Sequence, residues 1–177
     1  AVPRRPDLLA VSDPSPAAPL RWLAAAVAWW IRLPVALRCC LPPALMLVLW
    51  WSSSRQPTGG EASVVKSFLH NGAHILAYGA LATAWWALFV RRVPPPYLGA
   101  TAWGLSVAYG VVDELHQAAV PGRTCSVADL GSDAVGAWLA ILCLHWLHLQ
   151  HERARTMIPW AVCLAVLAVS LATFVSW

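Results

Sequence analysis

The sequence predicts an all-α, polytopic integral membrane bundle of about five transmembrane helices preceded by an interfacial helix. Of its 177 residues, 59% are hydrophobic and 11% are charged, whereas roughly a quarter are charged in an ordinary soluble domain. A soluble core of this size could not hide so much apolar surface. The apolar residues also form runs about as long as a bilayer crossing requires, and arginines flank most of these runs. We therefore expect a multi-pass protein of the cell membrane.

The N-terminal part combines a polar tail with two apolar elements. Residues 1–20 are rich in Pro and Arg without a long apolar stretch, and we interpret them as a disordered cytoplasmic tail. Residues 21–177 then form a single membrane domain. Residues 22–33 are rich in Trp and Ala with Arg near their ends, which predicts an interfacial helix. A first span is expected from about residue 37 to 51, although Pro42 and Pro43 interrupt its apolar run.

Two further spans follow a polar loop of Gly, Pro and Ser at residues 52–63. The second span covers residues 64–90 and stops at Arg91, Arg92 and a run of three prolines, which no helix continues through easily. The third span covers residues 97–112 and ends in the polar string of residues 113–117. This arrangement predicts an antiparallel hairpin of the second and third spans.

The C-terminal part supplies two more spans. A turn is expected at Pro121, Gly122 and Arg123, and the fourth span covers residues 126–149. The polar segment HERART follows at residues 151–156, and the fifth span covers residues 158–177. Gly136 and Ala137 on the fourth span are small enough to allow close helix approach.

The distribution of cations predicts the orientation of the chain, because Lys and Arg are enriched in cytoplasmic loops. With a cytoplasmic N-terminus, the C-terminus is extracytoplasmic. The cations of the cytoplasmic side are then Arg4, Arg5, Arg21, Arg32, Arg38, Arg91, Arg92, Arg153 and Arg155, and those of the other side are Arg55, Lys66 and Arg123. The net charge of +4 does not come from a basic cluster with interleaved aromatics, so no nucleic-acid partner is expected.

Polar side chains of three spans are expected to meet in one outer pocket. Lys66, His70, His74 and Tyr78 are spaced by four and form one stripe on the second span. The polar string of the third span brings Asp113, Glu114, His116 and Gln117, and the start of the fourth brings Asp129 and Asp133. A charge near the hydrocarbon costs about 2.5 to 3.5 kcal/mol on insertion scales. These groups are therefore expected to pair with each other or with a ligand.

General acid and base chemistry is the first role expected of this pocket. The candidate catalytic groups are His74, Asp113, Glu114 and His116; His74 with Asp113 or Glu114 would form a base and its orienting partner. Arg123 would clamp a phosphate through two parallel hydrogen bonds. The remaining candidates for substrate binding are Gln117, Tyr78, Asp129, Asp133, Lys66 and His70.

The residues of the pocket resemble a known family. Asp113-Glu114-Leu115-His116-Gln117, Pro121-Gly122-Arg123, Ser126, Asp129 and Gly136, together with His74 and Tyr78, are similar to the signature of the VanZ-like membrane proteins, named for a teicoplanin resistance determinant. The resemblance covers about residues 64–149. This chain has His70-Asn71 where that family usually has Asp-Lys, and Ala119 and Asp133 where it usually has an aromatic residue and Asn. The resemblance implies the architecture and a role in glycopeptide resistance.

Several alternatives remain open at this stage. Arg123 could form a purely structural ion pair with Asp113 or Glu114. His70 and His74 lie on one helical face that could bind a metal, but no dense metal-binding pattern is present and no metal is predicted. We expect an enzyme that acts on a membrane lipid head group or a lipid-linked envelope precursor, or else a non-catalytic binder of such a lipid or of a drug. A proton-coupled carrier is less consistent with five short spans without an inverted repeat. No cofactor is identified.

Overall fold

The computed structural model describes residues 21–55, 63–123, 125–149 and 152–175, and every regular element in these residues is a helix. The prediction of an all-α bundle is therefore confirmed. The six helices that the described residues form are α1 Arg21–Arg32, α2 Val35–Ser53, α3 Val64–Phe89, α4 Pro95–Ala118, α5 Val127–Leu149 and α6 Glu152–Val175. The predicted N-terminal tail lies outside the described residues.

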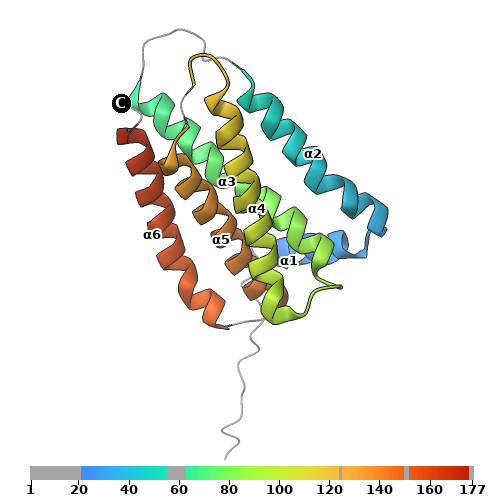
Figure 1. The fold of residues 1–177 in the computed structure, drawn as a ribbon. Helices are drawn as coiled ribbons and strands as arrows, with labels where there is room; N and C mark the ends of the chain where they lie inside the picture. Colours follow the sequence, from blue (N-terminus) through green and yellow to red (C-terminus); the bar gives the residue numbers. More distant parts are fainter. Residues whose placement is uncertain (1–20, 56–62, 124, 150–151, 176–177) are drawn as a thin grey trace, which may run out of the picture.

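The long helices run in alternating directions, and the short α1 lies crosswise to them (Figure 1). By length and composition, α2, α3, α5 and the greater part of α6 could cross a membrane, within the described ranges. Helix α4 is not in this set, so the count of five spans stays a prediction. Helices α2, α4 and α6 end where α3 and α5 begin (Figure 1). The polar string of α4 therefore lies at the same end of the bundle as the first turns of α3 and α5.

Three helices, α2, α4 and α6, are longer than the sequence predicted, and α2 extends by about two residues at each end. Helix α4 continues through the polar string to Ala118, because its carboxylates find hydrogen-bond donors inside the bundle. Helix α6 begins at Glu152 rather than at residue 158 and contains Pro159. A membrane helix tolerates such a proline where neighbouring groups satisfy the freed backbone. The residues from Glu152 onward in the predicted polar segment therefore belong to a helix.

The closest helix contact joins α3 and α5. A Cβ atom added to Gly136 would lie 2.6 Å from the Cα of Ile75 and would also overlap its carbonyl group. A Cβ atom added to Gly79 would lie 3.3 Å from the carbonyl oxygen of Gly136. Glycine at position 136 therefore allows the backbones of the two helices to touch, as small residues do at membrane helix interfaces.

The opposite end of the bundle carries a buried arginine. Arg38 of α2 is only 3% exposed, and its Nη1 donates to the carbonyl oxygen of Ala87 at 2.9 Å. Arg92 donates to the carbonyl oxygen of Leu88 at 3.0 Å. Both acceptors belong to the last turn of α3, where carbonyl groups lack helical partners and the helix dipole favours cations. These contacts fix the end of α3 and dock the start of α2 on it.

Helix α2 is otherwise peripheral. Its apolar side chains face outward along much of its length, with Leu47 69% and Trp51 61% exposed. Tyr109 of α4 donates its hydroxyl to the carbonyl oxygen of Met46. An outward apolar surface of this kind suits lipid contact.

Candidate functional site

A histidine and a carboxylate form the buried centre of the polar end. His74 Nδ1 on α3 lies 2.9 Å from Asp133 Oδ1 on α5. Asp133 is fully buried, and the His74 side chain is 12% exposed. With Nδ1 protonated, the His74 ring donates to the Asp133 carboxylate, which orients the ring and leaves Nε2 as its basic nitrogen. The sequence predicts Asp113 or Glu114 as the partner, but the close contact of α3 with α5 brings Asp133 there instead.

Two tyrosines and a glycine enclose this pair. The Tyr78 ring lies parallel to the His74 ring, with 6.3 Å between centroids, and Tyr109 lies 6.4 Å beyond Tyr78. A Cβ atom added to Gly110 of α4 would lie 3.3 Å from both Asp133 Oδ2 and Tyr78 Cε1. Gly110 thus allows α4 to close over the histidine–carboxylate pair.

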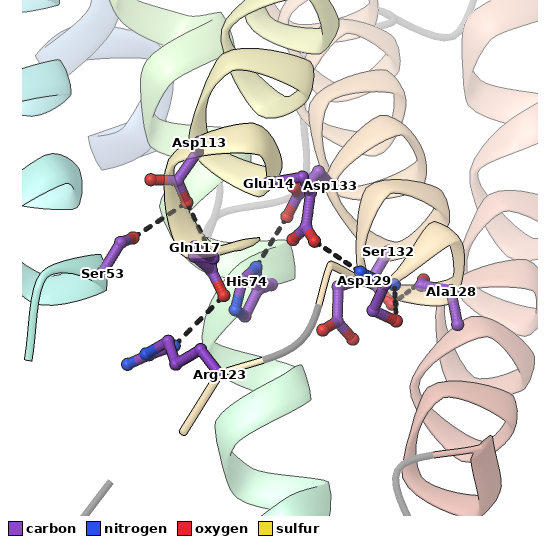
Figure 2. A network of polar contacts seen from close by, with 11 residues as sticks. Ser53, His74, Asp113, Glu114, Gln117, Arg123, Ala128, Asp129, Ser132 and Asp133 are labelled. Atoms are coloured by element: carbon purple, nitrogen blue, oxygen red, sulfur yellow. Dashed lines mark hydrogen bonds and ion pairs between the residues drawn. The ribbon is translucent and has the colours of Figure 1, made fainter. Parts of the chain in front are cut away.

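A second polar chain starts at Asp113 and ends at Arg123 (Figure 2). Asp113 Oδ2 accepts from Ser53 Oγ at 2.9 Å and from Gln117 Nε2 at 3.0 Å. Gln117 Oε1 accepts from Arg123 Nη1 at 3.2 Å, and Arg123 Nε donates to the Arg55 carbonyl oxygen at 3.1 Å. This chain joins the end of α4 to the end of α2.

Arg123 follows a turn in which Gly122 has a φ of 82°, a backbone conformation that glycine adopts without steric cost. Within the described part of the chain, the acceptors of its guanidinium are an amide and the carbonyl oxygens of Arg55 and Ser52. The alternative of a structural ion pair with Asp113 or Glu114 is thus not observed in that part of the chain. The contact with Ser52 is long, at 3.5 Å, so this edge of the fork can bind another anion.

Glu114 organises the start of α5. Its Oε2 accepts the backbone N–H of Ser126 at 2.7 Å, and Ser126 Oγ in turn accepts the N–H of Asp129 at 3.2 Å. A serine that accepts from the backbone three residues on is a helix N-cap. Glu114 therefore locks the first turn of α5 against α4.

A cavity of about 120 Å³ opens beside these groups. Its polar lining from α3, α4 and the following turn consists of His70, His74, Tyr78, Asp113, Gln117 and Arg123. Leu49, Ser52 and Ser53 of α2 close the other side. These residues could bind a polar group that enters from the end of the bundle.

The structure does not bring every predicted residue to this cavity. Lys66 is exposed on the first turn of α3. His116 stacks on Trp50 with 3.6 Å between ring centroids and forms a 2.9 Å hydrogen bond with Ser54. Asp129 is half-buried at the start of α5. Glu114 and Asp133 lie behind the lining, where they position Ser126 and His74.

Ser53 is a site residue that the sequence does not predict, because it falls in the expected loop of residues 52–63. The signal was the run of three serines at residues 52–54, directly after an apolar stretch. Hydroxyls in the last turn of a membrane helix can donate to a neighbouring helix, which is what Ser53 does for Asp113.

Four buried oxygen atoms of the cluster have no hydrogen-bond partner among the described residues: Asp113 Oδ1, Glu114 Oε1, Asp133 Oδ2 and Tyr78 Oη. A buried polar atom without a partner is costly, so such atoms call for explanation by a ligand, water or function. Among the described residues, no group of three or more His, Cys, Asp or Glu side chains is placed so that it could hold a metal ion.

Comparison with known proteins gives one match. A family model described as VanZ/LLP1 matches residues 25–148, from within α1 to near the end of α5. No curated protein and no solved structure matches the chain. The resemblance inferred from the polar motifs is confirmed, and the match extends it to the residues of α1 and α2.

Proposed function

This chain belongs to the VanZ/LLP1 family, and from that premise we propose that it acts on a lipid head group or a lipid-linked cell-envelope precursor. The observation that carries the proposal is the cavity at the end of an apolar bundle, with His74 held by Asp133 on one wall and Arg123 at another. A polar cavity that opens at the end of membrane-spanning helices suits a substrate whose tail stays in the bilayer while its head group leaves it.

The distribution of cations supports an extracytoplasmic cavity. Arg55, Lys66 and Arg123 lie near the cavity end, whereas Arg21, Arg32, Arg38, Arg91, Arg92, Arg153 and Arg155 belong to the opposite ends of their helices or to adjacent turns. The positive-inside rule then assigns the cavity to the outer leaflet. In a cysteine-free background, Thr58→Cys should react with an impermeant reagent from outside and Pro94→Cys only after permeabilisation. The reverse labelling would overturn this orientation.

We propose that His74 acts as the general base. Its Nδ1 is held by Asp133, so Nε2 is the nitrogen available to take a proton from water or from a substrate hydroxyl. Asp133 acts as a positioning residue, because it fixes the ring and stabilises the imidazolium that forms. Arg123 binds the phosphate of the substrate through the edge of its guanidinium that faces Ser52. Asp113 lines the cavity and is preferred for contact with the substrate over Glu114, which lies behind the lining; His116 is engaged with Trp50 and Ser54.

The test compares the envelope lipids and lipid-linked precursors of cells that lack the protein with those of cells that produce it. We expect one head-group or precursor class to change with the wild-type protein and to revert with His74→Gln. His148→Gln is the matched control, since this histidine packs on Trp86 at the opposite end of the bundle. Wild-type behaviour of His74→Gln at equal protein level would refute the role of His74 as base.

A non-catalytic binder is the second candidate. Among the described residues, the His74 ring is hydrogen-bonded to Asp133, and no serine, threonine or cysteine is hydrogen-bonded to it. A nucleophile would therefore have to be water or part of the substrate. Altered glycopeptide tolerance with an unchanged lipid and precursor profile would favour the binder over the enzyme.

A further inference from the structure

The polar cluster is short of hydrogen-bond donors rather than of acceptors. Asp113, Glu114 and Asp133 are 2%, 3% and 0% exposed, and each has one oxygen bonded and one without a partner in the described structure. The hydroxyl of the fully buried Tyr78, which can both donate and accept a hydrogen bond, is also without a partner there, so the shortage of donors is that of the three carboxylate oxygens. A ligand that satisfies this cluster must therefore bring donors.

The charge of the cluster indicates the same kind of ligand. Three buried carboxyl groups gather at this end, and His74 is the basic group hydrogen-bonded to one of them. Arg123 donates its fork to Gln117 and to backbone carbonyls, so it does not neutralise these acids directly. The cavity consequently has an acidic wall at Asp113 and a basic rim at Arg123. Such a division suits a zwitterion, with an anion at the rim and a cation farther in.

The type of cation follows from the geometry of the acceptors. A metal ion is disfavoured because no group of three or more metal-binding side chains was found among the described residues. A quaternary ammonium has no N–H group and cannot satisfy oxygen acceptors, and it is usually recognised by aromatic cages. A primary ammonium carries three donors on a compact head, which a cavity of about 120 Å³ can enclose.

We propose that the cavity selects a phosphoethanolamine-type lipid head group, with its phosphate at Arg123 and its primary ammonium at Asp113 and Tyr78. This inference rests on the proposed function, because it names the head group that the same cavity takes. Asp113 Oδ2 is already bonded to Ser53 and Gln117, so the ammonium binds Oδ1 without breaking that chain. Tyr78 offers a second oxygen acceptor from α3.

The experiment measures lipid binding to the purified full-length protein by native mass spectrometry. The probes are phosphatidylethanolamine, its mono- and dimethyl derivatives, phosphatidylcholine and phosphatidylglycerol, all with the same acyl chains. We expect affinity to fall with each N-methyl group, and phosphatidylcholine and phosphatidylglycerol to bind about tenfold or more weakly than phosphatidylethanolamine. This is the range expected for loss of a hydrogen bond to a charged group.

Two variants test the acceptors separately. Asp113→Asn should reduce the preference for phosphatidylethanolamine over phosphatidylcholine by about tenfold, and Tyr78→Phe by a smaller factor, because the latter removes a neutral partner. Tyr78→Phe keeps the ring that packs on His74, so it remains informative if Asp113→Asn does not fold. Ser106→Ala is the control, since this buried serine of α4 bonds within its own helix.

The outcomes separate this inference from the function on which it rests. Equal binding of phosphatidylethanolamine and phosphatidylcholine, or tighter binding of phosphatidylglycerol, overturns the ammonium site but leaves a lipid head-group site standing. An unaltered preference in folded Asp113→Asn and Tyr78→Phe also overturns it. Failure of a folded wild-type protein to retain any of these lipids overturns the ammonium site and counts against the phospholipid form of the proposed function.

Discussion

Two helix contacts place polar groups at the same cavity. One joins α3 to α5, the other joins α2 to the bundle, and the two are built differently. Helices α3 and α5 touch through backbone atoms at Gly136, and their polar pair, His74 and Asp133, is buried. Helix α2 exposes much of its apolar surface, and polar contacts near its two ends, from Arg38 and Ser53, hold it in place.

The difference indicates which wall of the cavity is held rigidly and which can move. A general base must be held within a fraction of an ångström of its working position, and packed helices achieve this better than a loosely docked one. The wall that α2 supplies can shift at lower cost, because fewer buried side chains must be separated. We therefore expect substitutions at the α3–α5 contact to cost more free energy of unfolding than substitutions that undock α2.

The largest effect is expected at Gly136. Gly136→Leu should abolish accumulation of folded protein, and Gly136→Ala should lower the free energy of unfolding by about 1–3 kcal/mol, because the new Cβ atom meets the backbone of Ile75. Gly131→Ala on the same helix is the control, since nothing lies within 4 Å of its added Cβ atom. Thermal unfolding in detergent measures both, and equal stability of the two alanine variants would contradict the backbone contact.

Asp133 is expected to come next. Asp133→Leu removes the acceptor of His74 Nδ1 and should lower the free energy of unfolding by about 1–3 kcal/mol. Asp133→Asn keeps an acceptor and should lower it less. Nitrogen-15 chemical shifts of His74 should show a change of ring tautomer only in the leucine variant. Equal stability of the leucine variant and wild type would show that the pair does not hold α3 to α5.

Arg38 tests the docking of α2 at the opposite end. Arg38→Met keeps the length of the side chain but loses the donor to the Ala87 carbonyl. The free energy of unfolding should therefore fall by about 1–2 kcal/mol. The loss should appear as faster hydrogen exchange in α2 and at the end of α3, with α5 unchanged. Uniform acceleration across all helices would mean that α2 is an integral part of the cooperative core.

Arg123 tests the link that the polar chain makes between the ends of α4 and α2. Arg123→Lys keeps the charge but cannot donate to Gln117, Arg55 and Ser52 together. It should lower the free energy of unfolding by about 1 kcal/mol. It should also lower the activity nearly as far as Arg123→Ala does. Binding of a phosphate lipid measures the functional part. Wild-type binding by the lysine variant would reduce Arg123 to a point charge.

The smallest effect is expected at Ser53. Ser53→Ala removes one of two donors to Asp113 Oδ2 and should lower the free energy of unfolding by about 0.5–1.5 kcal/mol. The loss is small because Gln117 still donates to that oxygen. Ser54→Ala is the matched control, since that hydroxyl donates to the Trp50 carbonyl and touches His116 outside the cavity lining. A larger loss from Ser54→Ala than from Ser53→Ala would place the anchor of α2 at His116.

The sequence predicted the helices better than their partners. Apolar runs of membrane-spanning length identified α2, α3 and α5 to within a few residues. The end of α4 was predicted too early, because a string of charged residues indicates solvent unless their internal donors are known. His74 and Asp133 were both selected as candidates, but which carboxylate His74 meets depends on a backbone contact at Gly136 that spacing along one helix does not reveal. Ser53 carries no periodic signal and gains its role only when α2 packs beside α4.

The buried Arg38 also bears on how the protein is made. Its acceptor, the Ala87 carbonyl, lies 49 residues later in the chain, in the last turn of α3. When α2 leaves the ribosome, this guanidinium therefore lacks its protein partner, and at the start of the helix it can stay among water and lipid head groups. Synthesis of α3 supplies the missing carbonyl oxygen. Burial of Arg38 should accordingly follow the synthesis of α3, so α2 reaches its final packed position only after α3 is made.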